Sequence, residues 1–417
     1  MAKTLKTWTA LGVAVAATGS LANAAMLHAP AIKTNPAYVL IEGEAGEGGE
    51  GGEGGGGAPT TYAIASTDAE AFKYDAKAQI DAYGNLVFTS YEKSKGDAKL
   101  LQTAIDALLK DASQTSLDAA RKAWIEARPA YLLTETYRFY DGPIEAIEGE
   151  INAWPMNEAY IDYVDGKPDA GIINGKESVD VATLATANQK SDEADVTTGW
   201  HAIEFLLWGQ DLSLAGPGNR PYTDYVAEQG NNDRRRTYLK AVTDKLVGDL
   251  ETLEQAWAPG VDGNYRAGFE KLDQREALGR IINGMAILAG FEFMSERLAV
   301  ALDSGDQEDE HSCFSDTTKQ DFVKDLEGIK RVWYNAKLGE LVASRDVELA
   351  KRVSDLFLDT EVKVGKLGDP WDKVLASPKD SAERKNAEAV VASLQALADG
   401  LKEVGNKLGV LVLVPTG

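Results

Sequence analysis

Residues 277–302 read ALGRIINGMAILAGFEFMSERLAVAL, and this stretch carries the pattern that decides the fold. Apolar side chains recur along it every three or four residues, at Ile281, Met285, Leu288 and Phe291. That spacing is typical of one buried face of an α-helix. The stretch therefore predicts a long helix over residues 277–302.

Helical spacing of apolar residues continues through most of the chain, whereas alternating runs of β-branched residues are few. This pattern favours an all-α protein, and the length suits two helical-bundle domains with a cleft between them. We expect helical domain 1 at residues 67–230 and helical domain 2 at residues 231–417. The other expected helices include residues 238–257, 322–337, 346–357 and 381–408.

The first 66 residues differ in composition from the rest. Residues 1–24 combine two early lysines, an apolar run and the sequence Ala22-Asn23-Ala24, which together are typical of a cleaved signal peptide. Residues 25–66 include a run of alternating Glu and Gly that has too few apolar side chains to form a core. We expect this second segment to be a flexible tether.

Composition limits the classes of function. The chain has 417 residues, a formal net charge of −23 and one cysteine. A surface this acidic repels nucleic acid and anionic membranes. No later apolar run is long enough to span a bilayer, and a single cysteine cannot form an internal disulfide. We therefore expect a soluble protein exported to the periplasm or cell envelope, without nucleic-acid partners or a transmembrane segment.

Several local predictions concern residues 115–138. Thr115 followed by Asp118 resembles a capping box and predicts a helix start, and Pro129 should kink or interrupt that helix. Glu135 and Arg138 stand three apart in the next block, which we expect to be helical. They could form an ion pair within a helix, or Glu135 could be a metal ligand that Arg138 orients.

Residues 199–204 read GWHAIE and are the strongest candidate for chemistry. On a helix, His201 and Glu204 would leave the same face, and an imidazole nitrogen and a carboxylate oxygen can share one divalent cation. The same pair could instead be a hydrogen-bonded brace that only stabilises the fold. Gly199 would let a backbone segment or a ligand approach closely.

A second candidate is residues 308–316, which read EDEHSCFSD. His311 and Cys313 could form a nucleophilic pair or a metal site, although acids cluster by chance in so acidic a chain. Nothing around Cys313 is typical of an activated cysteine, so papain-like catalysis is not expected.

Several blocks, taken in order, resemble one family. GWHAIE fits the Gly-x-His-x-x-Glu signature of imelysin-like proteins. WIEARPAYLLTETYRF, INAWPMNEAYIDYV and DEHSCFSDTT are similar to blocks of its iron-regulated protein A branch, and the resemblance covers roughly residues 70–415. It implies an exported, all-α protein of two helical bundles with its site in the cleft between them.

The resemblance also implies site residues and ligands. His201 and Glu204 are the expected metal ligands, with Glu135 a further candidate. Arg138 and Gly199 are expected beside the bound group. If residues 309–318 face the same cleft, three more candidates follow, namely Asp316, His311 and Glu310. The ion would be divalent or ferric, with iron favoured and zinc allowed, and the partners would be other iron-uptake proteins of the cell envelope.

The family is classed with metallopeptidases, which leaves a zinc peptidase as the alternative. A zincin motif has two histidines around a general-base glutamate, His-Glu-x-x-His. Here one histidine stands in the motif and Phe205 follows Glu204. A peptidase would need further ligands from elsewhere, with Glu204 or Glu135 as the base, so the sequence leaves open whether the chain is an enzyme.

Overall fold

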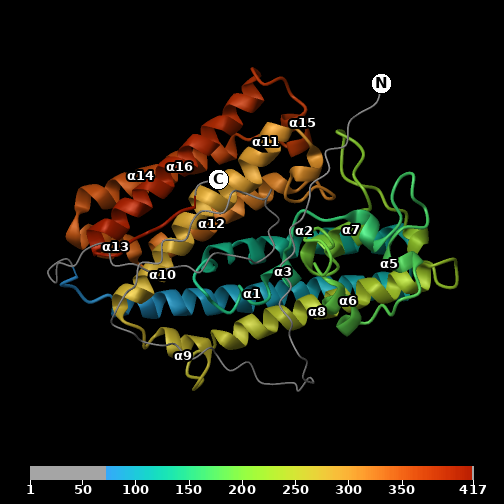
Figure 1. Ribbon diagram of the computed structural model, residues 1–417, viewed down its shortest axis with the longest axis horizontal. Coiled ribbons are helices and arrows are strands. Elements are labelled where there is room, and N and C mark those ends of the chain that lie inside the picture. The colour runs from blue at the N-terminus through green and yellow to red at the C-terminus, as the bar shows by residue number, and fades with distance from the viewer. Residues whose placement is uncertain (1–71, 416–417) are drawn as a thin grey trace, which may run out of the picture.

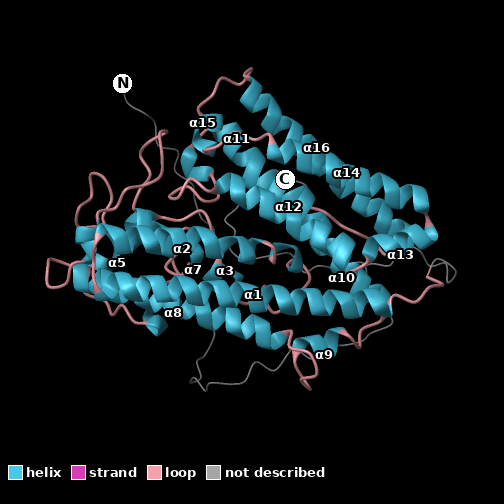
Figure 2. Ribbon diagram, turned by 180° about the vertical axis from the view of Figure 1, so that it is seen from behind, coloured by secondary structure: helices cyan, strands magenta, loops and turns pink. Residues whose placement is uncertain are grey.

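The computed structural model describes residues 72–415, and helices dominate this part of the chain (Figure 2). It contains no β-strand within those residues, only an isolated bridge between Val164 and Lys167. The predicted all-α class is therefore confirmed. The predicted signal peptide (1–24) and tether (25–66) lie outside the described residues.

One group of helices comes mainly from the N-terminal half and lies along the lower part of Figure 1. Its long members pack against one another, α1 on both α2 and α8, and α7 on α2 and α8. Their bounds are α1 Lys77–Lys110, α2 Gln114–Leu132, α7 Gly199–Trp208 and α8 Asn232–Ala256. Short helices connect α2 to α7 and follow it: η1 Glu135–Tyr137, α3 Glu148–Ile151, α4 Glu158–Ile161, α5 Gly171–Asn174, α6 Val181–Ala187 and η2 Tyr222–Tyr225.

A second group comes from the C-terminal half and lies across the first (Figure 1). Helix α16 packs against α14, α10 and the segment after α10. The bounds are α9 Tyr265–Phe269, α10 Gln274–Ile287, η3 Leu288–Ala299, α11 Val300–Ser304, η4 Gln307–Asp309, α12 Thr318–Asn335, α13 Leu338–Arg345, α14 Val347–Gly365, α15 Trp371–Leu375 and α16 Ala382–Leu408. The helices predicted in this half are present, and α14 extends beyond its predicted end.

Helix α12 joins the two groups, because it packs against α2 and α1 as well as against α14. Buried apolar residues from both groups form one continuous core. Helix α8 begins just after residue 230, where we placed the domain boundary, yet it packs with α1 and α7. The division into two domains remains a prediction, and these contacts put α8 with the N-terminal helices.

The start and the proline of α2 differ from the sequence prediction. Ser113 caps the helix: its hydroxyl accepts from the Ser116 backbone N–H, and the Ser116 hydroxyl accepts from that of Ser113. The capping box predicted at Thr115 is therefore wrong. Pro129 lies inside α2, and it removes the N–H that Ile125 O would accept. The side-chain amide of Gln320 donates to Ile125 O at 3.1 Å, so α2 continues to Leu132.

The helix predicted over residues 277–302 is present but not uniform. After α10 the chain widens into a π-helical stretch, η3, before α11 resumes the α-helical form. A π-helix aligns residues five apart, and Arg297 Nη2 accordingly contacts Glu292 Oε1 at 3.1 Å. Apolar periodicity reveals the helix but not this change of pitch.

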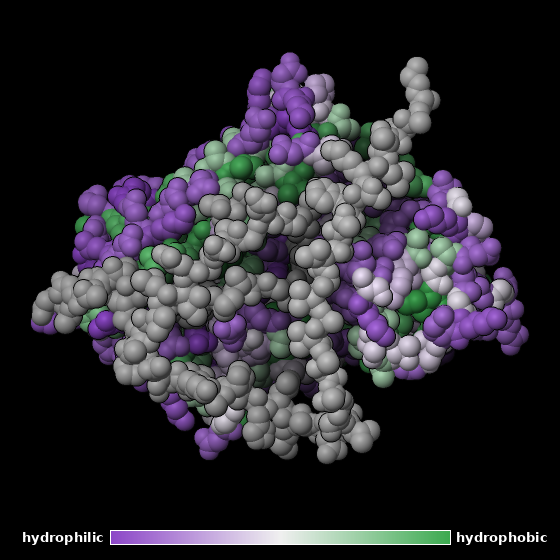
Figure 3. Space-filling model, in the orientation of Figure 1, coloured by the Kyte–Doolittle hydropathy of each residue, from purple (hydrophilic) through white to green (hydrophobic). Residues whose placement is uncertain are grey.

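The described surface is largely polar. In Figure 3, hydrophilic side chains dominate the face not covered by grey atoms, and apolar side chains form separate patches. Within residues 72–415, no helix combines the length and apolar character needed to cross a membrane.

Candidate functional site

Helix α7 places His201 and Glu204 side by side, as their spacing predicts. His201 Nδ1 lies 3.0 Å from Glu204 Oε2, and both side chains are fully buried. Gly199 starts the helix with φ of 89°, and a Cβ there would lie 2.3 Å from Ile151 O. Glycine is thus required because a backbone carbonyl packs against it.

Arg128, on α2, lies between the two buried histidines. Its Nη2 is 3.1 Å from His201 Nε2, and its Nη1 donates to Asn152 Oδ1 at 2.9 Å. Arginine can only donate, so His201 Nε2 accepts and Nδ1 carries the proton that faces Glu204. Arg128 Nε also contacts Asp321 Oδ2 at 3.2 Å. We call His201, Glu204, Arg128, His311 and Asp321 the histidine centre.

His311 reaches this centre from the loop before α12. Its ring centroid is 5.2 Å from that of His201, and its Nδ1 is 2.8 Å from Asp321 Oδ2. Arg128 Nη2 also lies 3.5 Å from this nitrogen, but the shorter contact with the aspartate favours a proton on Nδ1 and leaves Nε2 as the acceptor. Carboxylates orient metal-binding histidines in the same way. The loop also supplies Ser315, whose N–H and hydroxyl both donate to Glu204 Oε1, at 3.0 and 2.6 Å.

Burial controls the charges in the histidine centre. Burial, helped by the neighbouring Arg128, lowers the pKa of His201 well below its usual value. Burial and Arg297 do the same to the pKa of His311. Burial raises the pKa of Glu204 to about 8, against the opposing effect of Arg128. Both imidazoles are therefore neutral at pH 7, and Glu204 is largely protonated while no cation is bound.

The structure places Glu135 and Arg138 in a neighbouring group of charges. Residues 135–137 form a 3₁₀ turn and Arg138 is extended, so the helix predicted here is wrong. The predicted ion pair is present, with Arg138 Nη1 2.8 Å from Glu135 Oε2. Arg297 contacts the same oxygen at 2.5 Å and Asp325 Oδ2 at 2.8 Å. We call Glu135, Arg138, Glu148, Glu292, Arg297 and Asp325 the arginine network.

The carboxyl groups of the arginine network differ in pKa, because burial and the nearby arginines act in opposite directions. Burial alone would raise the pKa of Glu135, but Arg138 and Arg297 outweigh it and lower the pKa to about 2. Burial prevails at Glu148, where the pKa rises to about 7, and at Asp325, where it rises to about 8. The positive charges of Arg138 and Arg297 are thus balanced by Glu135, which is ionised at pH 7, and by the partial ionisation of Glu148 and Asp325.

Two predicted ligands, Glu310 and Asp316, lie in a third group. The Asp316 carboxylate lies with those of Asp211 and Asp372, and Glu310 is in hydrogen-bonding contact with Asp372. We call Asp211, Glu310, Asp316 and Asp372 the acidic cluster. Cys313, on the same loop, is fully buried, and burial with nearby Glu310 raises the pKa of its thiol well above the usual value. A thiolate nucleophile is therefore disfavoured there.

Two residues of the histidine centre, Arg128 and Asp321, were missed by sequence reasoning, as was Asn152, which bonds to Arg128. A signal existed for two of them. Arg128 falls on the apolar face of α2 that includes Trp124 and Tyr131, and Asp321 falls on the face of α12 that includes Phe322. A charge on a buried helical face needs a buried partner. Asn152 lies just after α3 in a loop, where no periodicity marks it.

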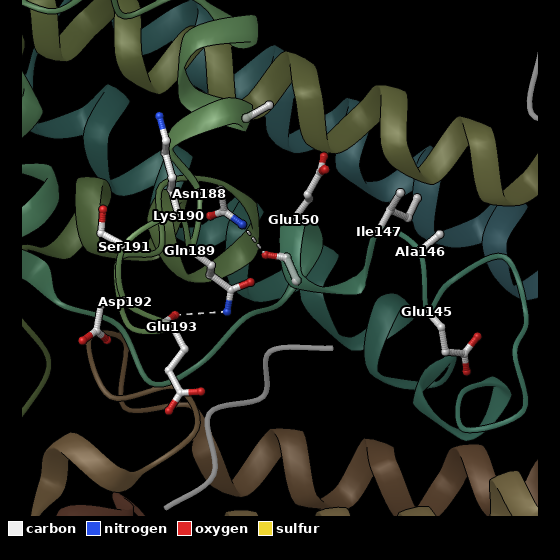
Figure 4. Close-up of a pocket in the computed structure, with 12 residues that line it drawn as sticks. Glu145, Ala146, Ile147, Glu150, Asn188, Gln189, Lys190, Ser191, Asp192 and Glu193 are labelled. Atoms are coloured by element: carbon white, nitrogen blue, oxygen red, sulfur yellow. Dashed lines mark hydrogen bonds between the residues drawn. The ribbon is translucent and has the colours of Figure 1, made fainter. Parts of the chain in front are cut away.

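A polar pocket of about 460 Å³ lies beside the start of α7 (Figure 4). Its wall includes Gly149 and Glu150 of α3, and the Thr198 hydroxyl donates to Glu150 O at 2.8 Å. Figure 4 shows Asn188 bonded to the Gly149 carbonyl and Gln189 to that of Glu193. His201 does not line this pocket.

Comparison with known proteins gives the family. The imelysin (peptidase M75) profile matches residues 87–401, more than half of the chain. The chain belongs to the imelysin family. Iron-regulated protein A of Synechococcus elongatus is 21% identical over 326 residues, covering 74% of this chain and 80% of that protein.

Solved structures share the fold of this imelysin-family chain. A candidate iron-regulated protein A precursor from Parabacteroides distasonis has a TM-score of 0.68 at 16% identity, covering 82% of this chain and 98% of that one. An imelysin-like protein from Psychrobacter arcticum has a TM-score of 0.61 at 15% identity, covering 85% and 99%. At such identities the likeness establishes the helical fold, as the sequence blocks implied.

Proposed function

We propose that the chain is an exported metal-binding protein that carries iron, with His201 and Glu204 as its ligands and His311 beside them. The observation that supports this most directly is the 3.0 Å separation of His201 Nδ1 and Glu204 Oε2 within a buried centre. Two ligand atoms at right angles, each about 2.1 Å from one ion, lie about 3 Å apart. The same spacing that allows their hydrogen bond therefore also allows the two atoms to share a cation.

The protonation states of the side chains in the histidine centre also favour cation binding. Neutral imidazoles are the metal-binding form of histidine, and burial keeps both rings neutral. Glu204 receives only a serine hydroxyl, a backbone N–H and a neutral ring as partners. A cation would supply the countercharge that raises the acidity of this carboxyl group. Mixed nitrogen and oxygen ligands suit iron.

Arg128 opposes the same cation. A metal on His201 Nδ1 moves the ring proton to Nε2, where it would face the Arg128 N–H at 3.1 Å. Loading therefore requires Arg128 to turn toward its other partners, Asn152 and Asp321. The arginine makes binding weaker and dependent on a side-chain movement, which suits a carrier better than a permanent cofactor site.

Glu135, Arg138 and Gly199, which were also predicted as site residues, support the proposed site without binding the metal. Glu135 contributes its negative charge from the arginine network, where Arg138 holds it, and Gly199 lets α7 start against α3. The relative from Synechococcus elongatus is named an iron-regulated protein, and this name supports iron as the ion. Export to the periplasm and partnership with other iron-uptake proteins of the envelope belong to the same proposal.

Peptidase activity has less support from the geometry. His201 is 1% exposed and Glu204 is fully buried. A peptide bond would have to reach both groups, and a general base must lie within hydrogen-bonding reach of the attacking water. The only family-level argument for cleavage is the classification of imelysin with peptidases.

Calorimetric titration of the full chain with Fe²⁺ under reducing, anaerobic conditions tests the proposal. We expect His201→Ala and Glu204→Gln each to weaken binding by at least about 100-fold, because each removes a direct ligand. The control is Glu361→Gln, an exposed carboxylate on α14. Unchanged Fe²⁺ binding in His201→Ala, with a lowered melting temperature, would instead make the pair a structural brace.

A further inference from the structure

The acidic cluster gathers carboxylates from three separate parts of the chain. Asp211 follows α7, Asp316 precedes α12, and Asp372 is the second residue of α15. One carboxylate oxygen from each lies within 4.8 Å of the other two. Three acids held this close in one place repel one another unless protons or a cation intervene.

In the described part of the chain, no basic side chain pairs with this cluster. Among residues 72–415, none of its four carboxyl groups forms an ion pair with lysine, arginine or histidine. Asp372 is fully buried, and among the described residues no donor outside the cluster reaches either of its oxygens. Glu310, also fully buried, faces Asp372. Buried carboxylates normally have partners, so their absence calls for a ligand.

We propose that the acidic cluster is a second metal site, separate from the histidine centre, that binds a hard divalent cation of the Ca²⁺ kind. All of its donor atoms are oxygens, which Ca²⁺ prefers. Ca²⁺–O distances of about 2.3–2.6 Å allow ligand oxygens on opposite sides of the ion to lie about 4.6–5.2 Å apart. Mg²⁺ demands a near-ideal octahedral arrangement, whereas Ca²⁺ tolerates an irregular set of oxygens such as this one.

The cluster borders a pocket at Asp372, and Asp316 is partly exposed. Asp372 lines a pocket of about 380 Å³, together with Gly305, Gln307 and Leu375. Ca²⁺ takes about six to eight oxygen ligands, and water in this pocket can complete the set. The Gln307 side chain donates to the Asp211 carbonyl at 2.6 Å and so holds the pocket wall against the cluster.

The raised pKa of Asp316 is consistent with a cation site in the acidic cluster. Burial, with Asp372 and Asp211 beside it, raises the pKa of Asp316 to about 8. Without a cation Asp316 therefore keeps most of its proton at pH 7. Binding of Ca²⁺ would release protons, which a titration in two buffers of different ionisation enthalpy can count.

Terbium luminescence of the full chain provides the test, since Tb³⁺ takes Ca²⁺ sites and the indole of Trp371, next to Asp372, can sensitise it. We expect sensitised emission that Ca²⁺ displaces. Asp372→Asn and Asp316→Asn should each weaken Ca²⁺ binding at least tenfold. His201→Ala and Glu204→Gln should leave it unchanged, which separates this site from the proposed iron site.

The matched control is Asp355→Asn, an exposed aspartate on α14, because so acidic a chain attracts cations generally. Equal loss of binding in Asp355→Asn and Asp372→Asn would overturn the proposal in favour of diffuse surface attraction. Unchanged Ca²⁺ affinity in both cluster variants would also overturn it.

The melting temperature distinguishes a variant that has lost the Ca²⁺ site from one that is simply misfolded. In EDTA, we expect Asp372→Asn to melt at or above the wild-type temperature, because it removes a buried carboxylate that pairs with no basic side chain of the described residues. Saturating Ca²⁺ should then raise the melting temperature of the wild type but not that of Asp372→Asn. An equal rise in both proteins would contradict the site.

Discussion

The arginine network and the acidic cluster handle buried negative charge in opposite ways. In the network, Arg138 and Arg297 lie among the carboxyl groups and lower the pKa of Glu135 to about 2. In the cluster, neighbouring acids and burial raise the pKa of Asp316 to about 8. The comparison teaches that the fold compensates one set of acids internally and leaves the other dependent on protons or ions from solution.

The largest expected effect comes from removing the internal compensation. Arg297→Met removes the guanidinium that Glu135 and Asp325 share. Breaking a buried ion pair in this way should lower the free energy of unfolding by about 3–5 kcal/mol. Urea unfolding followed by circular dichroism measures the loss. The control Arg352→Met breaks an exposed pair with Glu403 and should cost about 0.5 kcal/mol or less. Similar losses in the two variants would remove the contrast.

A second prediction concerns the positive charge inside the histidine centre. Arg128→Gln removes the guanidinium that faces His201 Nε2, while an amide can still reach toward Asp321. If this charge opposes the metal, Fe²⁺ affinity should rise about tenfold, which corresponds to about 1.4 kcal/mol. Titration of the variant beside the wild type measures it. Weaker binding would mean that Arg128 supports the metal rather than opposing it.

A third prediction concerns an uncharged group, the backbone carbonyl of Ile125, which also depends on a partner from another helix. Pro129 deprives Ile125 O of its helical partner, and Gln320 replaces that partner. Gln320→Ala should lower the free energy of unfolding by about 1 kcal/mol, because a partly buried carbonyl loses its hydrogen bond. The double variant Pro129→Ala with Gln320→Ala restores the backbone N–H and should recover part of this loss. No recovery would show that Gln320 acts through other contacts.

The smallest effect is the pH dependence of the metal-free protein. The raised pKa of Asp316 means that the folded state holds this proton more tightly than the unfolded chain does. This contribution is full below the ordinary carboxyl pKa and is lost as pH rises toward about 8. Because Asp316 is only partly buried, solvent screening keeps it below about 1 kcal/mol. Melting temperatures in EDTA between pH 5 and 8 should therefore fall slightly, and less in Asp316→Asn.

Helical periodicity revealed most of the fold, because each long helix buries one continuous apolar face. It also placed His201 beside Glu204, a contact that depends only on local helix geometry. It could not reveal the π-helical pitch of residues 288–299, since widening the helix changes its hydrogen bonds more than its composition. The start of α2 was missed because Ser113 and Ser116 formed the cap in place of Thr115.

The sites depended on contacts between distant segments. Arg128 could have been suspected from its position on an apolar helical face, but its partners His201 and Asp321 come from two other helices. The acidic cluster had no local signal, because Asp211, Asp316 and Asp372 are far apart in a chain already rich in acids. Only the tertiary fold brings together the segment after α7, the loop before α12 and the start of α15.

The loop of residues 310–316 has consequences for both groups of side chains. His311 and Ser315 point to the histidine centre, while Glu310 and Asp316 point to the acidic cluster. If a ligand on one side changes the position of this loop when it binds, it alters affinity on the other side, and thermodynamics then requires the two effects to be reciprocal. Calcium in the surroundings would then tune how tightly iron is kept, and iron would tune the uptake of calcium by an equal factor.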